Sequence, residues 1–279
     1  MKPAADPPAS GPGLEPPLIA APLRVLYLFA GHRRRATIRE ALGRPLDTLP
    51  WGRRFTLDIF RELDILQDAS HDLLDFSLQA QIIGEVESGV YHLVIASPPC
   101  ETFSRARHSN RRGPPPVRSR EYPRGVPWLA KRWRQQVEAA NALVTFSAQV
   151  MAAAATANVR GHWVRALLEH PEDLGLTNDQ VPASIFQWPI IKDLVNTSKY
   201  ETFAFWQCHF KAEFAKPTRL ISNIADLSCA GFTGWPISPR ALPTRGRSRT
   251  HAVTRRTRRS SASPAMNGRR STPRSTRWP

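Results

Sequence analysis

Three runs of apolar residues most constrain what this chain can fold into. Residues 23–31, 91–96 and 164–168 are each almost continuously apolar, as expected of strands that are buried on both faces of a parallel sheet. Helical patterns of apolar residues lie between them, at residues 36–42, 78–86 and about 133–159. Strands that alternate with helices predict an α/β fold with a doubly wound, mostly parallel sheet.

Weaker signals complete this expected sheet. A second strand is expected within residues 55–65, and two more at residues 202–210 and 219–224. Pro182 is expected to open a short helix, and residues 101–132 to form a long polar loop. In doubly wound sheets ligands bind beyond the carboxyl ends of the strands. Gly31, Cys100 and Glu169 fall at such ends, which predicts a site there.

The length and composition predict one folded domain with two tails. A chain of 279 residues with 41% hydrophobic residues has room for one sizeable core, which we expect over residues 23–235. Residues 1–22 hold seven prolines and no strand or helix period, which predicts a flexible arm. Residues 236–279 are rich in Arg, Ser, Thr and Pro, which predicts a disordered tail.

The net charge belongs mostly to that tail. Residues 236–279 contain twelve arginines and no acidic residue, so they leave only +4 of the formal charge of +16 to the rest of the chain. The tail is either an electrostatic arm or nuclear-import signal, around Arg255, Arg256, Arg258 and Arg259, or an accidental sequence from a shifted reading frame.

The cysteines and the apolar pattern bear on the compartment. Cys100, Cys208 and Cys229 lack the paired spacing of a zinc site or a disulfide framework, so no metal site is expected and a reducing compartment fits. We recognise no signal peptide and no apolar span of about 18 residues or more. We therefore expect an intracellular protein that does not enter a membrane, nuclear in a eukaryote and otherwise cytoplasmic.

Cys100 is the first candidate for chemistry. It follows two prolines at a strand end, where a rigid turn can hold a thiol at the mouth of the sheet. Arg105 and Arg107 lie close in sequence and would favour the thiolate. The competing interpretation is that an isolated cysteine is a small, buried core residue.

The residues around Cys100 suggest a family. Residues 97–104, Ser-Pro-Pro-Cys-Glu-Thr-Phe-Ser, resemble the Pro-Cys motif of the cytosine-C5 DNA methyltransferases. Residues 28–31, Leu-Phe-Ala-Gly, resemble the first motif of that family, a turn under the methionine end of the cofactor. Residues 168–171, Leu-Glu-His-Pro, are similar to its Glu-Asn-Val motif. The three motifs occur in the family's order, and the resemblance covers roughly residues 23–224.

This resemblance implies a Rossmann-like fold that binds S-adenosyl-L-methionine, with DNA as the partner. It implies that Cys100 attacks cytosine C6 and that Glu169 holds N3 and the exocyclic amine. The cofactor-binding residues that it implies are Phe29, Ala30, Gly31, Asp64, Asp72 and Pro98. The substrate-binding residues are Ser104, Arg105 and Arg219. For Asp64 and Asp72, the alternative to cofactor binding is that they cap turns or helices. For Arg219, the alternative to substrate binding is a surface arginine that binds nothing.

The chain also departs from the family pattern. His32, Arg33 and Arg34 place bulk where the family has small residues, and His170 replaces the asparagine of the Glu-Asn-Val motif. Nothing after Trp235 resembles the family's last motif, which completes the cofactor pocket.

Three functions therefore compete. The first is a DNA cytosine-C5 methyltransferase that uses S-adenosyl-L-methionine. The alternative is an inactive nucleic-acid-binding relative, from a decayed mobile element or a shifted reading frame. A third keeps the chemistry but takes cytosine in RNA as substrate.

Overall fold

The chain is described by a computed structural model over residues 21–32, 37–43, 55–109, 113–175, 181–213, 215–224, 227 and 232–233. The tail at residues 236–279, most of the arm at residues 1–22, and Arg33, Arg34 and Cys229 lie outside these described residues. Residues 21 and 22 were expected in the arm, but they already belong to the first strand.

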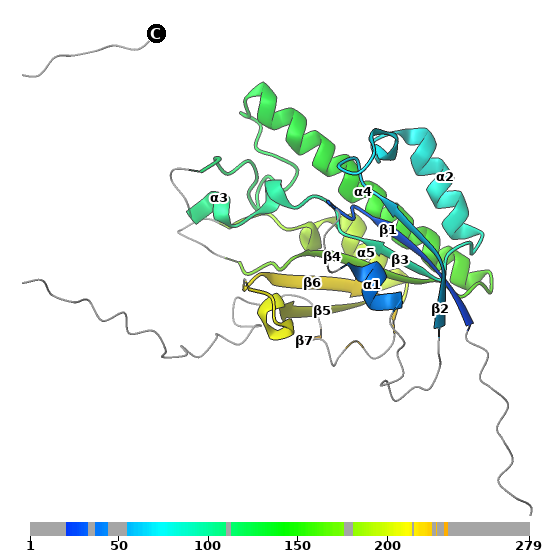
Figure 1. Cartoon of the computed structure of the whole chain (residues 1–279). Coiled ribbons are helices and arrows are strands. Elements are labelled where there is room, and N and C mark those ends of the chain that lie inside the picture. Colours follow the sequence, from blue (N-terminus) through cyan, green and yellow to red (C-terminus); the bar gives the residue numbers. More distant parts are fainter. Residues whose placement is uncertain are drawn as a thin grey trace, which may run out of the picture. The chain divides into compact units, whose positions relative to one another are not determined.

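Seven strands form one sheet in the order β2-β1-β3-β4-β6-β5-β7 (Figure 1). They are β1 (Ala21–Leu28), β2 (Phe55–Leu63), β3 (Leu93–Ala96), β4 (Arg165–Pro171), β5 (Glu201–Trp206), β6 (Pro217–Ser222) and β7 (Phe232–Thr233). The first four strands of the chain run parallel, whereas β6 is antiparallel to both β4 and β5, and β7 is antiparallel to β5. The architecture is therefore α/β with a mixed sheet.

The expectation of a mostly parallel sheet is wrong, since three of the six strand pairings are antiparallel. The physical reason is the short connection between β5 and β6. Only residues 207–216 join these strands, and a parallel crossover needs about a dozen residues or more. The two strands therefore pair as antiparallel neighbours, and β6 inserts between β4 and β5.

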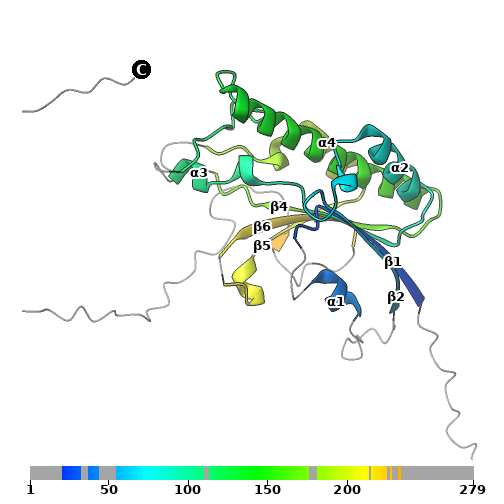
Figure 2. The same ribbon diagram turned by 45° about the horizontal axis from the view of Figure 1, so that its top comes forward.

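The helices lie on both faces of this sheet, unequally. They are α1 (Ile38–Gly43), α2 (Phe76–Glu87), α3 (Ala106–Ser109), α4 (Lys131–Val159) and α5 (Pro189–Thr197), with short 3₁₀ turns η1 (Ala69–His71), η2 (Glu101–Phe103), η3 (Ile185–Gln187) and η4 (Gln207–Phe210). Figure 2 shows α2 and α4 on one face and α1 on the other. The α5 helix packs beside α4.

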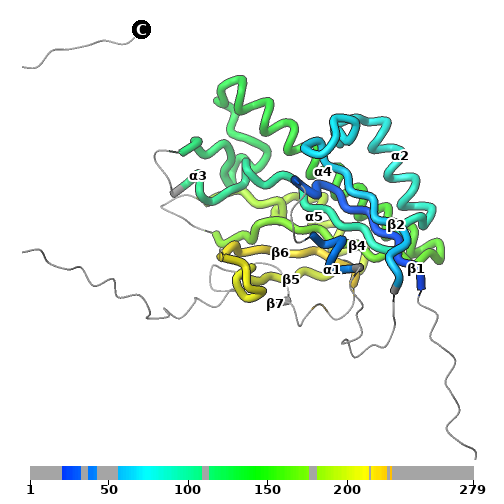
Figure 3. Tube along the Cα trace, viewed as in Figure 1, coloured from blue at the N-terminus to red at the C-terminus, as the bar shows by residue number. Residues whose placement is uncertain are grey.

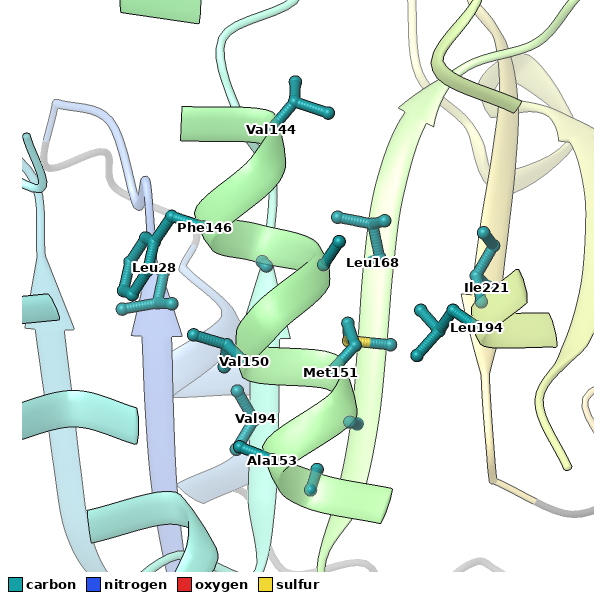
Figure 4. Packing of buried hydrophobic residues seen from close by; sticks show 14 of the residues in the cluster. Leu28, Val94, Val144, Phe146, Val150, Met151, Ala153, Leu168, Leu194 and Ile221 are labelled. Atoms are coloured by element: carbon teal, nitrogen blue, oxygen red, sulfur yellow. The ribbon is translucent and has the colours of Figure 1, made fainter. Parts of the chain in front are cut away.

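The main core lies between α4 and the sheet. Phe146 packs toward Leu28 of β1, and Met151 lies between β4 and α5 (Figure 4). Each such buried side chain stabilises the fold by about 1.5–3 kcal/mol. Among the helices that the structure describes, α4 alone is long and apolar enough to span a bilayer, but half of that stretch is buried inside the protein, as in a core helix. The opposite face has a smaller cluster around Leu23, Val25 and Ile95.

Most of the expected elements are confirmed, with boundaries that shift by a few residues. The predicted strands at residues 23–31 and 55–65 are β1 and β2, and the long helix predicted from residue 133 is α4. The prediction that Pro182 opens a helix is wrong. Pro189 does so instead, at the first turn of α5, where its missing N–H costs nothing. Residues 207–210, predicted as strand, form the η4 turn.

Candidate functional site

The carboxyl ends of the four parallel strands align at one edge of the sheet. Leu63, Leu28, Ala96 and Leu168 stand opposite one another across β2, β1, β3 and β4. The residues that follow this row therefore share one edge, and they include most of the predicted site. Figure 3 shows the chain leaving β3 at this edge, through α3, before it returns as α4.

The turn after β1 is held in a specific conformation. Phe29 has φ 62° and Gly31 has φ 72°, a region that a side chain disfavours. Gly31 donates its N–H to Asp64 Oδ2 at 2.7 Å, and Gln67 Nε2 donates to the carbonyl of Gly31 at 2.7 Å. Two side chains that follow β2 thus fix the predicted cofactor turn.

Asp64 and Asp72 both serve as caps in this structure. The second carboxylate oxygen of the buried Asp64, Oδ1, accepts the N–H of Leu66 at 2.8 Å. Asp72 Oδ1 accepts the N–H of Leu74 at 2.9 Å. The capping alternative therefore describes what these carboxylates do here, and their contact with a cofactor stays a prediction.

Gly31 has space beside it within the described part of the chain. A Cβ placed on Gly31 would meet no atom of the described residues within 4 Å, and residues 33–36 are not among them. Ile65 and Leu66, directly after Asp64, are exposed large apolar residues. Contact of this turn with S-adenosyl-L-methionine stays a prediction.

Cys100 lies at the same edge, half-buried at the start of η2. Pro98 is buried and Pro99 is exposed. Of these two prolines, Pro98 therefore packs the turn against the protein interior, while Pro99 only restricts its backbone. Burial raises the pKa of the Cys100 thiol, Lys216 acts to lower it, and Glu169 and Glu101 act to raise it further. The interpretation of Cys100 as a fully buried core residue does not fit its partial exposure or the charged groups that act on its pKa.

The arginines that were expected to activate Cys100 have other partners. Arg107 donates to the carbonyls of Glu101 and Pro115, at 2.8 and 3.2 Å. Arg105 Nη1 donates to the carbonyl of Gly175 at 2.7 Å. The cation that lowers the thiol pKa is Lys216, so the sequence-based expectation named the wrong cations.

Glu169 and Lys216 form an ion pair at this edge. Lys216 Nζ lies 3.0 Å from Glu169 Oε1, and both side chains are partly exposed. Glu169 belongs to β4, where it stands opposite Leu220 of β6, and Lys216 directly precedes β6. The antiparallel insertion of β6 brings the lysine to the glutamate, and the sequence offers no sign of this pairing.

Arg219 occupies the protein interior. Only 2% of its side chain is exposed, and its guanidinium binds Glu172, with Nη2 at 2.8 Å from Oε2, and donates to Thr202 Oγ1 at 2.9 Å. The alternative of an unpaired surface arginine is therefore wrong. The predicted contact with a substrate stays a prediction, and the guanidinium would first have to leave Glu172.

A small pocket of about 20 Å³ lies at the end of η2, lined in part by Phe103, Arg105, Asp173 and Ser184, and Cys100 is not part of its lining. His170 also lines it, and neither ring nitrogen has a hydrogen-bond partner among the described residues. Burial lowers the pKa of His170 to about 3, with help from Lys216 and Arg118, so the ring is neutral. Ser104 lies nearby in sequence, and its Oγ accepts the N–H of Ala106 at 3.3 Å.

Arg118 was not predicted and holds the segment after Cys100. Its buried guanidinium lies 4.0 Å from the ring centroid of Phe103 and donates to Thr102 Oγ1 at 3.0 Å and to Asn141 Oδ1 at 2.6 Å. Other N–H groups of the same guanidinium donate to the carbonyls of Pro123 and Val137. One side chain thus ties η2 to the following loop and to α4.

No model of a known protein family matches this chain, and no curated protein matches its sequence.

Proposed function

We propose that the protein is a DNA cytosine-C5 methyltransferase that uses S-adenosyl-L-methionine. The observation that carries the proposal is the position of Cys100, half-buried at the carboxyl edge, within the electrostatic reach of Glu169 and Lys216. The role of this thiol is also implied by the resemblance of residues 28–31, 97–104 and 168–171 to three motifs of that family.

The sheet supports a Rossmann-like methyltransferase fold as the finer classification. In its order β2-β1-β3-β4, the strand that leads to the cofactor turn has a parallel neighbour on either side. A crossover from β2 on one side of β1 to β3 on the other is the kind of switch point at which doubly wound sheets bind ligands.

S-adenosyl-L-methionine would be held by the turn of Phe29, Ala30 and Gly31, with Ile65, Leu66 and Pro98 as further contacts. Bound there, it supplies an electrophilic methyl group. Asp64 contributes by fixing the N–H of Gly31, which keeps the turn open. Its oxygens each accept one N–H in this structure and retain a further lone pair for a ribose hydroxyl.

Cys100 would act as the nucleophile. Its Sγ, as the thiolate, would form a bond to cytosine C6, which moves electron density to C5. Once C5 has gained the methyl group, water would accept the C5 proton and the C6–Sγ bond would break, which returns the thiolate. Because burial raises the thiol pKa, the thiolate is scarce in the free protein. The thiolate therefore depends on nearby positive charge, which Lys216 supplies.

Glu169 would hold the base while the thiol adds. Its carboxyl group can bind the exocyclic amine and, when protonated, N3, which stabilises charge on the ring. In the free protein Glu169 is paired with Lys216, so base binding exchanges one partner for another. The released ammonium can then turn to the base carbonyl or to the Cys100 thiolate.

An inactive nucleic-acid-binding relative is the second candidate, and one observation favours it. Arg219, the residue proposed to contact the substrate, is held inside the protein by Glu172 and Thr202. Such a protein would keep the fold and bind DNA through its basic residues without transferring a methyl group.

Methyl transfer from labelled donor to cytosine in DNA separates these candidates. The full chain should form 5-methylcytosine, detected by mass spectrometry of the digested nucleosides. Cys100→Ala should abolish product, whereas Cys208→Ala, a second partly buried thiol, should retain it. Product from RNA but not DNA would select the RNA substrate. Salt-sensitive DNA binding without any product from wild type would select the inactive relative.

A further inference from the structure

A basic surface with one exposed tryptophan lies beside the candidate site. It consists of exposed side chains from the loop before α4 and from the first turn of that helix: Arg120, Arg124, Trp128, Lys131, Arg132 and Arg134. We refer to it as the Trp128 surface. Glu121 is the only acidic residue in residues 117–134, so this stretch carries a clear positive charge.

Trp128 is large, apolar and 73% exposed, yet it is held in place. Its ring contacts Tyr122 edge to face, with centroids 5.6 Å apart. The backbone around it is fixed by the bond from Val126 N to the carbonyl of Val117 and by the turn that Gly125 closes on Tyr122. An ordered and exposed indole is a ready surface for stacking, since little side-chain entropy remains to be lost.

A chain of ring contacts joins this surface to Cys100. The Arg124 guanidinium lies 4.3 Å from the ring centroid of Trp188, and Trp188 lies 6.0 Å from Phe103. Phe103 ends the η2 turn that begins at Cys100. Trp188 and Phe103 are buried, so this chain of contacts runs inside the protein and places Arg124 of the Trp128 surface close to the η2 turn.

The positive charge here is costly for the free protein. Lys131, Arg132 and Arg134 stand in the first turn of α4, whose helix dipole is positive at this end, and that turn contains no acidic residue and no side-chain cap. An anionic polymer that lies along these residues would relieve this repulsion and release its counterions.

We infer that the Trp128 surface binds single-stranded DNA next to the target cytosine, with one unpaired base stacked on the Trp128 ring. Cations that follow a phosphate backbone, combined with an aromatic ring that stacks on bases, are how proteins bind single strands without reading their sequence. The indole has no base to stack on in an intact duplex. The choice of DNA rests on the proposed function, whereas the preference for unpaired bases rests on Trp128 alone.

The test compares binding of a single-stranded oligonucleotide and of its duplex by fluorescence anisotropy. The full chain is used with Cys100→Ala and without donor, so that catalysis plays no part. Trp128→Ala should weaken single-strand binding by about 5-fold to 100-fold, the worth of one stacked base, and duplex binding much less. Trp163→Ala is the matched control, because Trp163 is 50% exposed beside Arg165 at the opposite edge of the sheet.

The charges are tested separately through the salt dependence. Changing Lys131, Arg132 and Arg134 to Gln together should reduce the slope of log affinity against log salt by about 2, whereas Trp128→Ala should leave the slope unchanged. Arg160→Gln, at the other end of α4, is the control. An RNA oligonucleotide of the same sequence tests whether the surface prefers DNA. Equal affinity for the DNA and RNA oligonucleotides would overturn the assignment of DNA as the ligand.

The inference is overturned if Trp128→Ala behaves like Trp163→Ala, or if it weakens single strand and duplex equally. It is also overturned if the triple Gln variant keeps the wild-type slope. Failure of methyl transfer is a separate result, because an inactive relative that binds single strands would still show the Trp128 pattern. Conversely, methyl transfer with no effect of Trp128→Ala would retain the enzyme and reject this surface.

Discussion

Lys216 donates a hydrogen bond to Glu169 at 3.0 Å, and these two side chains act on the pKa of Cys100 in opposite directions. Burial is the largest of the effects on this thiol, ahead of either charge, so the pKa is raised and the thiol keeps its proton. A ligand that bound Glu169 would change this balance, because it would leave the ammonium of Lys216 to act on the sulfur alone.

The first prediction concerns the reactivity of Cys100. Because its pKa is raised, its alkylation by iodoacetamide should keep accelerating above pH 9. Glu169→Gln removes a negative charge and should increase the rate at pH 8 by about 2-fold to 10-fold, whereas Lys216→Gln should decrease it similarly. Mass spectrometry of the Cys100 peptide measures the rate, and Cys208 is the internal reference. If neither substitution changed the alkylation rate, Glu169 and Lys216 would not act on the Cys100 thiol.

The second prediction concerns the interior pair of Arg219 and Glu172. Arg219→Met leaves a buried carboxylate without its partner and should lower the free energy of unfolding by about 3–5 kcal/mol. Urea denaturation followed by circular dichroism measures this loss. Arg160→Met breaks an exposed pair with Glu87 and should cost about 1 kcal/mol or less. Equal losses in the two variants would contradict an interior ion pair.

The third prediction concerns acid stability and His170. Its pKa is about 3 in the folded protein and about 6.5 when unfolded, so only the unfolded chain takes up a proton as the pH falls below about 6.5. The free energy of unfolding should therefore decrease by up to about 1.4 kcal/mol per pH unit from about pH 6.5 toward pH 3.

His170→Asn should remove this contribution, because asparagine does not titrate. Urea denaturation at pH 8 and pH 5 measures this contribution. The difference in the free energy of unfolding between wild type and variant should be constant above pH 7. At pH 5 the wild type should have lost about 2 kcal/mol more than the variant, relative to pH 8. Parallel curves over the whole range would mean that the folded protein also protonates His170.

The fourth prediction concerns Arg118. Burial, with Arg124 and Arg107 nearby, lowers its pKa to about 9, and no carboxylate is among its contacts in the described part of the chain. Arg118→Met removes four hydrogen bonds that join η2, the following loop and α4. Hydrogen exchange should become at least 10-fold faster in residues 101–130 while α2 is unchanged. Arg120→Met, at a more exposed neighbour, should leave both regions unchanged.

The sequence predicted the parallel half of the sheet well, because buried parallel strands are continuously apolar and each ends in a recognisable turn. It did not reveal the direction of β5 and β6, since an apolar run has the same appearance either way. The signal for their direction is the connection of ten residues between them, which is too short for a parallel crossover.

The site was predicted where its residues follow strands and missed where they come from elsewhere. Phe29, Cys100 and Glu169 lie at the shared edge because parallel strands align there. Gln67 and Arg118 act across long stretches of chain, and nothing local marks them. The family resemblance implied Arg219 as a substrate contact and gave no role to Lys216. The sequence does not show that β6 is a central strand, which buries Arg219 and leaves the preceding lysine at the edge.

The most direct test of the central claim is a covalent trap. The full chain is incubated with S-adenosyl-L-methionine and DNA that carries 5-fluorocytosine, whose fluorine cannot leave as a proton does, so the bond from Sγ to C6 persists. The account predicts a denaturation-resistant complex with the base on the Cys100 peptide, formed by wild type and Cys208→Ala but not by Cys100→Ala. A wild-type protein that binds this DNA and the donor, yet forms no such complex, would contradict it.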